Sequence, residues 1–133
     1  MKVILDTGPL VALLNRRDAR HDWALEAMGK FEPPLWTCEP VLAEAGHLSG
    51  KPAEILAQVT AGSLHIGLEI RENAAHLQRL LLRYGQRMDL ADACIVRMTE
   101  IFSDCKVLTL DRTDFSIYRR LGRGVIPMIA PED

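Results

Sequence analysis

The chain has 133 residues, of which 48% are hydrophobic and 26% charged, and these ordinary values exclude a disordered or fibrous protein. The length favours one domain over residues 1–133 with one core. The formal net charge of -2 excludes a polycation that binds nucleic acid by bulk charge alone. Most of the positive charge is arginine, which suits phosphate contacts and is equally explained by a GC-rich genome.

Targeting and redox signals are weak. No apolar run is long enough to span a membrane, and the first run meets Asp6 too soon for a signal peptide, so we expect a cytoplasmic protein without membrane contact. Cys38, Cys94 and Cys105 are odd in number and widely spaced, without a CxxC pair. They support neither a disulfide framework nor a zinc site, and we expect them to be small buried hydrophobic residues.

Short β-rich runs alternate with amphipathic helical stretches, which predicts an α/β fold around a parallel sheet. The first strand is expected at residues 2–5, and a helix with Pro9 in its first turn follows to about Asn15. Asp18 is expected to cap a helix over residues 19–30. The next expected elements are a strand at 35–37, a helix from Pro40, a helix at 53–61 and a weak strand at 64–66.

The second half continues the alternation. A stripe of leucines predicts a helix over residues 72–84. The elements expected beyond it are a helix capped by Asp89 that runs to about Ser103, a strand at 106–110, a helix from Asp114 to about Leu121 and a strand at 124–129. Pro127 in the last strand indicates a sheet edge, because proline cannot donate to a neighbouring strand.

Acidic residues follow two of the expected strands. Asp6 comes directly after the first strand, and Asp111 comes directly after Leu110. The carboxyl ends of parallel strands meet at one edge of a sheet, so the two acids would lie close together if their strands are neighbours. Each also has an interpretation as a helix cap, which is the only role we assign to Asp89.

Two further acids lie on expected helices among small apolar residues. Glu44 stands next to Ala43 and Ala45, and Asp92 lies one turn into its helix. Acids in such surroundings are less easily explained as solvated surface. Clustered carboxylates repel and need a cation, and an all-oxygen ligand set selects magnesium or manganese. A metal held in this way is the usual apparatus for phosphoryl transfer.

Four segments carry a family resemblance. They are VILDTGPLVAL at 3–13, TCEPVLAEA at 37–45, MDLADA at 88–93 and LTLDRTDF at 108–115. In this order and spacing the chain resembles the PIN-domain family, in particular its branch of VapC-type toxins, over essentially its whole length. The resemblance implies a three-layer α/β/α fold with a five-stranded parallel sheet in the order 3-2-1-4-5.

The resemblance also implies an activity and its residues. Asp6, Glu44, Asp92 and Asp111 would be both the catalytic and the metal-binding residues, with one or two Mg2+ or Mn2+ ions. The reaction would be the cleavage of single-stranded or looped RNA by metal-activated water. No arrangement of serine, histidine and aspartate for nucleophilic catalysis is evident, and the histidines are interpreted as structural or exposed.

Supporting residues and partners follow from the same resemblance. Thr7 matches a hydroxyl that supports the metal site, and Asp114 matches a variable acidic position, for which a helix-cap role is at least as good. A small antitoxin would cover the acidic site, and we expect a homodimer. The first two helices carry many apolar residues, which we interpret as ordinary core, with a dimer or antitoxin groove left open. They are Leu13, Leu14, Trp23, Leu25 and Met28.

Other function classes fit the motifs less well. A haloacid-dehalogenase-like phosphatase needs an acid where Gly8 stands, and a response-regulator receiver needs an acidic pair at the first strand. A flap-type DNA nuclease needs a larger acidic set and DNA-gripping segments. Within the PIN family, a non-catalytic RNA-binding or scaffold domain is disfavoured because all four acids are present. A housekeeping PIN nuclease without an antitoxin stays open.

Overall fold

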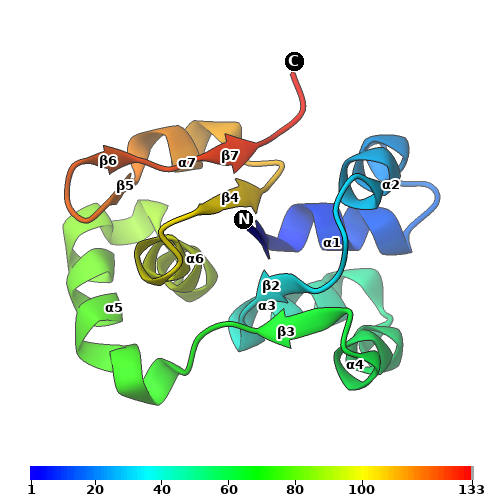
Figure 1. Ribbon diagram of the computed structural model, residues 1–133, viewed down its shortest axis with the longest axis horizontal. Helices are drawn as coiled ribbons and strands as arrows, with labels where there is room; N and C mark the ends of the chain where they lie inside the picture. The colour runs from blue at the N-terminus through cyan, green and yellow to red at the C-terminus, as the bar shows by residue number, and fades with distance from the viewer. Residues whose placement is uncertain (133) are drawn as a thin grey trace.

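The computed structural model describes residues 1–132, and its centre is a five-stranded parallel sheet flanked by helices (Figure 1). The strands are β1 (Lys2–Leu5), β2 (Leu35–Thr37), β3 (Leu64–Ile66), β4 (Cys105–Leu108) and β7 (Met128–Ile129). Their order is β3-β2-β1-β4-β7, which confirms the predicted sheet with β7 as its fifth strand. Strand β1 is central, and Leu5 pairs with Leu108 of β4, so both strands end at the same level.

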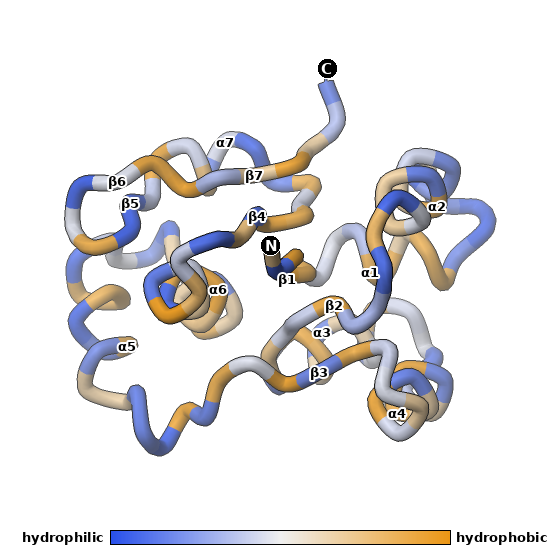
Figure 2. The backbone as a smooth tube through the Cα atoms, in the orientation of Figure 1, coloured by the Kyte–Doolittle hydropathy of each residue, from blue (hydrophilic) through white to orange (hydrophobic). Residues whose placement is uncertain are grey.

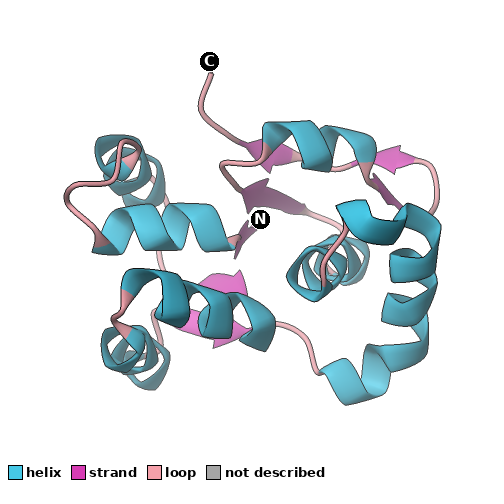
Figure 3. Cartoon of the chain, turned by 180° about the vertical axis from the view of Figure 1, so that it is seen from behind, coloured by secondary structure: helices cyan, strands magenta, loops and turns pink. Residues whose placement is uncertain are grey.

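Helices connect the strands, as a parallel sheet requires. They are α1 (Thr7–Leu14), α2 (His21–Gly29), α3 (Glu39–Ser49), α4 (Pro52–Ala61), α5 (Ile70–Tyr84), α6 (Leu90–Ile101), α7 (Arg112–Ile117) and a short 3-10 turn, η1 (Gly85–Arg87). Figures 1 and 3 show α1 and α2 at the opposite end of the molecule from α5. None of the helices within residues 1–132 has the length and apolar character needed to cross a membrane.

Burial explains which elements are central. Ile4 and Leu5 of β1 are fully buried, and so are Val107 and Leu108 of β4. Helix α6 packs against these strands and buries residues around most of its circumference, as expected for a helix inside the core. By contrast, α5 alternates between hydrophilic and hydrophobic residues along its length (Figure 2), as expected for a surface helix.

The segment after β4 differs from the prediction. The helix expected from Asp114 to Leu121 begins earlier and ends earlier, as α7, because the Asp111 side chain accepts a hydrogen bond from the Asp114 N–H at 3.0 Å. The chain then reverses through Leu121 and Gly122, whose φ angles are 51° and 81°. The Arg123 N–H donates to the Arg120 carbonyl oxygen at 3.2 Å and closes this tight turn.

That reversal splits the predicted last strand. Strand β5 (Arg119–Arg120) pairs antiparallel with β6 (Gly124–Val125), so only Met128 and Ile129 of the expected strand at 124–129 join the main sheet.

Near the N-terminus, Asp18 does not cap α2 as predicted. Its carboxylate accepts a bond from the Arg20 N–H at 2.8 Å and closes the turn before the helix, which begins at His21.

Candidate active site

A pocket of about 450 Å³ opens beyond the ends of β1 and β4, and all four predicted acids line it. They come from separate parts of the chain: Asp6 follows β1, Glu44 lies on α3, Asp92 on α6, and Asp111 precedes α7. The other lining residues are Thr7, Gly8, Val11, Leu48, Arg87, Asp89, Leu110 and Asp114. The lining therefore holds six carboxylates and one cationic side chain.

The pairing of β1 with β4 fixes Asp6. Because Leu5 and Leu108 are partners, the residues that follow them are level, and the Thr109 hydroxyl donates to Asp6 Oδ2 at 2.6 Å. The Thr7 N–H donates to Asp6 Oδ1 at 2.8 Å. Gly8 lets α1 approach the loop after β4, since a Cβ there would lie only 3.0 Å from the Leu110 side chain. Both Asp6 oxygens are thus held in place.

Asp6 is unusually hard to ionise. Its exposed fraction is 8%, and burial raises its pKa to about 6 against the opposing effect of the Thr109 and Thr7 hydrogen bonds. Repulsion from Asp111 acts in the same direction as burial. A nearby cation would favour the charged form and reverse this shift.

Asp92 lies in the first turn of α6. It forms a capping box with Asp89, whose side chain accepts a bond from the Asp92 N–H at 2.8 Å. The Tyr118 hydroxyl donates to Asp92 Oδ2 at 2.8 Å. Burial raises the pKa of Asp92 to about 7, and repulsion from Asp89 and Asp6 adds to the effect, while the Tyr118 bond opposes it.

Asp111 and Asp114 belong to the start of α7. Asp111 caps the helix, and burial raises its pKa above the usual value. Asp114 pairs with Arg87, whose Nη1 lies 2.7 Å from Asp114 Oδ1. The cap interpretation is confirmed for Asp6, Asp89 and Asp111, but each of these caps also lines the acidic pocket, so the two roles coexist.

Glu44 differs from the other three acids. Its small apolar neighbours make a solvated surface position less expected, but Glu44 is exposed and lines the pocket. The buried stripe of α3 runs through Val41, Ala45 and Gly46, and the helical period turns Glu44 away from that stripe. The apolar neighbours of Glu44 therefore do not shield it from solvent, and it lies in the pocket lining with the other three acids.

The donor set suits a hard divalent cation. Its ligands would be carboxylate oxygens, which magnesium and manganese prefer. The hydroxyl oxygen of Thr7 is buried and has no hydrogen-bond partner within residues 1–132. This is expected for a polar atom whose partner is a bound ligand or a water molecule of that ligand. Within that same range, no group of three His, Cys, Asp or Glu side chains is arranged closely enough to hold a metal ion as it stands. Magnesium commonly keeps several waters and binds through one or two carboxylates, so the donors still fit it.

The structure adds residues that line the pocket or bond its acids, and that the sequence did not identify as functional. Thr109 had one signal, a hydroxyl inside the expected strand at 106–110. Asp89 was recognised only as a cap. Arg87 and Tyr118 gave no signal, because their bonds to Asp114 and Asp92 join residues 27 and 26 positions apart.

Two other hollows lie near α1. The larger, of about 740 Å³, is lined by Arg16, Arg17 and Lys51 with Glu54 as its one carboxylate, so it cannot supply an acidic metal site. An apolar pocket of about 310 Å³ lies among α1, α2 and α4.

The apolar residues of the first two helices, which we interpreted as core, lie in different surroundings. Leu14, Trp23 and Met28 pack on the core, Leu13 lines both hollows, and Leu25 is 56% exposed.

Known proteins resemble the chain along its whole length. Residues 3–121 match the family model described as the PIN domain. Ribonuclease VapC26 of Mycobacterium tuberculosis is 29% identical over 137 positions, which cover 96% of this chain and 99% of that relative.

Solved structures share the fold. VapC20 of Mycobacterium tuberculosis, a toxin that cleaves the sarcin–ricin loop, matches with a TM-score of 0.70 at 20% identity, over 85% of this chain and 92% of its own. VapBC2 from Rickettsia felis, bound to a DNA fragment from its promoter, matches with a TM-score of 0.63 at 14% identity, over 99% of this chain and 100% of the other. At these identities the likeness concerns the fold.

Proposed function

The chain belongs to the PIN-domain family, and we propose that its acidic pocket is the active site of a metal-dependent endoribonuclease of the VapC toxin type. The observation that carries this proposal is the gathering of Asp6, Glu44, Asp92 and Asp111 in one pocket beyond β1 and β4. Three of them have pKa values raised by burial, which a bound cation would offset.

In this proposal Asp6, Asp92 and Asp111 hold one or two Mg2+ or Mn2+ ions, and Glu44 reaches in from the rim. A bound ion supplies neutralising charge for the scissile phosphate and makes a water molecule easier to deprotonate. The chain's own residues do the rest. A carboxylate that is not committed to the metal accepts the proton of the attacking water. Thr7 offers a hydroxyl to the metal's water.

Arg87 is suited to hold the substrate. It is the one cationic side chain in the described lining of the pocket, and one of its nitrogens is bonded to Asp114. A guanidinium carries five donors, so most remain for a phosphate oxygen. The acidic pocket repels a polyanion in the absence of metal. The substrate class we propose is single-stranded or looped RNA, in keeping with the ribonuclease name of the VapC26 relative.

We also propose a small antitoxin that covers the acidic site, and a homodimer of this chain. The VapBC2 structure pairs a protein of this fold with a partner. The apolar pocket among α1, α2 and α4 offers a surface that a partner could cover. Copurification of the chain with the product of a neighbouring reading frame tests the antitoxin, and the molar mass in solution tests the dimer.

Cleavage of RNA tests the activity. Purified protein should cut a looped single-stranded RNA with Mg2+ or Mn2+, and excess chelator should abolish the cut. Asp92→Asn should lose nearly all activity while remaining folded. Asp22→Asn is the matched control, because Asp22 is an exposed acid in the first turn of α2, outside the pocket. Equal cleavage in chelator, or by Asp92→Asn, would refute the proposal.

A further inference from the structure

The hydroxyl of Tyr118 connects three segments beside the acidic pocket. Tyr118 follows α7 and is fully buried. Its hydroxyl oxygen lies 2.8 Å from the carbonyl oxygen of Arg87 and 2.8 Å from Asp92 Oδ2. The rings of Tyr84 and Phe115 pack edge-on against it, at centroid distances of 5.0 and 5.3 Å. Packing of the ring therefore fixes where the hydroxyl lies.

The two oxygens of Asp92 are in different surroundings. Oδ2 accepts the bond from Tyr118 and a longer one, of 3.4 Å, from the Asp89 N–H. Oδ1 accepts no hydrogen bond from any residue between positions 1 and 132. One oxygen is thus tied to the protein, while the other is available to a ligand in the pocket that Asp92 lines.

We propose that Tyr118 is a positioning residue for the metal site: it holds Asp92 by Oδ2 so that Oδ1 is presented to the cation. The hydroxyl has one hydrogen and two acceptors, and an ionised carboxylate is the stronger acceptor, so Tyr118 donates to Asp92 in the metal-bound state. This inference rests on the proposed function, because it assigns Asp92 to the metal.

The same hydroxyl also lies beside Arg87. Its oxygen is 2.8 Å from the Arg87 carbonyl oxygen, which can receive the hydroxyl hydrogen only when Asp92 does not, while the Arg87 guanidinium bonds Asp114 on α7 at 2.7 Å. Helix α7 and the residue that follows it therefore contact η1 twice, through Asp114 and through Tyr118. These contacts place Arg87, the proposed phosphate-binding residue, close to Asp92, the proposed metal ligand on α6.

The competing explanation is that Tyr118 is only a core residue whose hydroxyl is satisfied. The chain provides a matched control, because Tyr84 is the only other tyrosine. Its hydroxyl accepts a bond from the Arg119 N–H at 2.9 Å, and neither tyrosine is among the residues that line the pocket. Tyr84→Phe and Tyr118→Phe each remove one hydrogen-bonded hydroxyl and leave the ring, but only the second removes a contact with a pocket carboxylate.

The experiment measures Mn2+ binding by the full chain, by calorimetry and by electron paramagnetic resonance of free Mn2+. Partners that orient a metal ligand typically contribute about 10-fold to 100-fold to affinity. Tyr118→Phe should weaken Mn2+ binding by that factor, and Tyr84→Phe by less than about two-fold. Both variants should lower the melting temperature in chelator by similar amounts. Raising the Mn2+ concentration should restore much of the RNA cleavage by Tyr118→Phe.

The outcomes separate this inference from the proposed function. If wild type binds Mn2+, Asp92→Asn does not, and Tyr118→Phe binds as wild type does, the positioning role is overturned and the metal site stands. If Asp92→Asn binds Mn2+ as tightly as wild type, both are overturned.

A measurement on wild type does not depend on the folding of a variant. With 13C at the ζ position of tyrosine, the chain gives two resonances, one from each tyrosine. Mg2+ should shift the Tyr118 resonance and leave the Tyr84 resonance in place, and Asp92→Asn should abolish the shift. A Tyr118 resonance that does not respond to Mg2+ would contradict the inference.

Discussion

Asp6, Asp92 and Asp111 are each held by hydrogen bonds that also organise the start of a helix. Asp6 and Asp111 cap α1 and α7, and Asp92 completes the capping box of α6. A cap uses a carboxylate oxygen to satisfy a backbone N–H, which fixes the side chain without filling its remaining lone pairs. The local structure therefore fixes the acids of the proposed metal site, so the same residues contribute to stability and to that site.

These acids make metal-free stability depend on pH. The folded-state pKa values of Asp6 and Asp92, about 6 and about 7, lie above their ordinary value of 3.8. The folded protein binds more protons than the unfolded chain in this range, so stability falls as pH rises. The contribution is fully present below pH 4 and is lost as pH rises through 6 and 7. Melting temperatures in chelator from pH 4 to pH 8 should show the fall.

Neutral variants identify the groups responsible for this pH dependence. Asp6→Asn and Asp92→Asn should each flatten the decline, because each removes one group with a raised pKa. Asp22→Asn, on the exposed first turn of α2, should keep the wild-type slope. A slope unchanged in both pocket variants would show that other groups control the pH dependence.

At the scale of elements, most of the fold was predictable. Hydrophobic runs located β1 and β4, and proline and glycine located the limits of α3 and α4, because these features are local. The hairpin of β5 and β6 was missed, since it depends on contacts with distant elements. One such contact is the bond from the Leu121 N–H to Glu100 Oε2 at 2.6 Å. The joint lining of the pocket by four acids agreed with the prediction, whereas the contacts of Arg87 and Tyr118 depend on tertiary packing alone.

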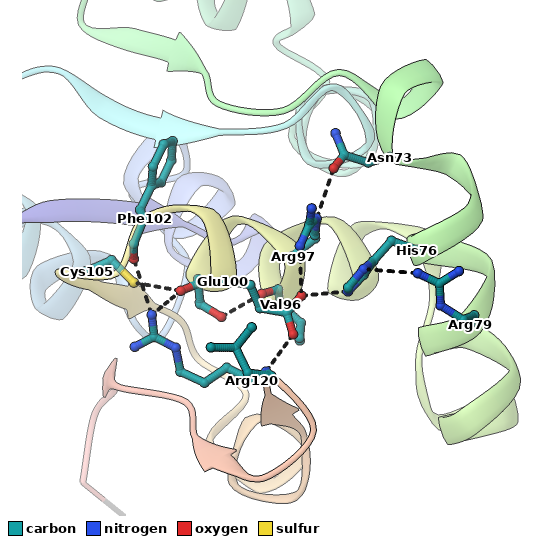
Figure 4. Close-up of polar contacts among 11 residues, drawn as sticks. Asn73, His76, Arg79, Val96, Arg97, Glu100, Phe102, Cys105 and Arg120 are labelled. Atoms are coloured by element: carbon teal, nitrogen blue, oxygen red, sulfur yellow. Dashed lines mark hydrogen bonds and ion pairs between the residues drawn. The ribbon is translucent and has the colours of Figure 1, made fainter.

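Glu100 connects three elements (Figure 4). Its side chain is 2% exposed and accepts from His76 Nε2 on α5 at 2.7 Å, from Arg97 on α6 at 3.5 Å, and from the hairpin at Leu121. Arg120 of the hairpin donates to the carbonyl oxygens of Thr99, Phe102 and Ser103 near the end of α6. This cluster, far along α6 from Asp92, fixes the hairpin that follows Tyr118.

Glu100→Ala should destabilise the fold by about 3 kcal/mol, because removing one partner leaves buried polar groups without a counterpart. Glu26→Ala is the control. Glu26 pairs with Lys30 at 3.8 Å, but its side chain is 77% exposed, so its loss should cost under about 1 kcal/mol. Urea unfolding in chelator gives both values. A loss by Glu100→Ala no larger than that of the control would mean that the cluster does not hold these elements together.

At the scale of the whole molecule, the strand order determines where the chemistry lies. With β1 between β2 and β4, the residues after β1 and β4 are neighbours, and α3 and α6 bring their acids to the same edge. The unfolded chain has no such gathering, so an ion that binds the pocket binds only the folded state. Such binding must raise the free energy of unfolding.

Magnesium should therefore stabilise wild type by about 2.7 kcal/mol at about 100 times its dissociation constant, or roughly 10 °C in melting temperature for a domain of this size. Asp92→Asn should melt higher than wild type in chelator, because the variant lacks the repulsion and the burial penalty of that carboxylate. It should gain less from magnesium, because it lacks one ligand. Four melting curves suffice: wild type and Asp92→Asn, each in chelator and in magnesium, at pH 8. If wild type melts identically with and without magnesium, and the variant is simply less stable in both, then Asp92 acts only in the capping box of α6.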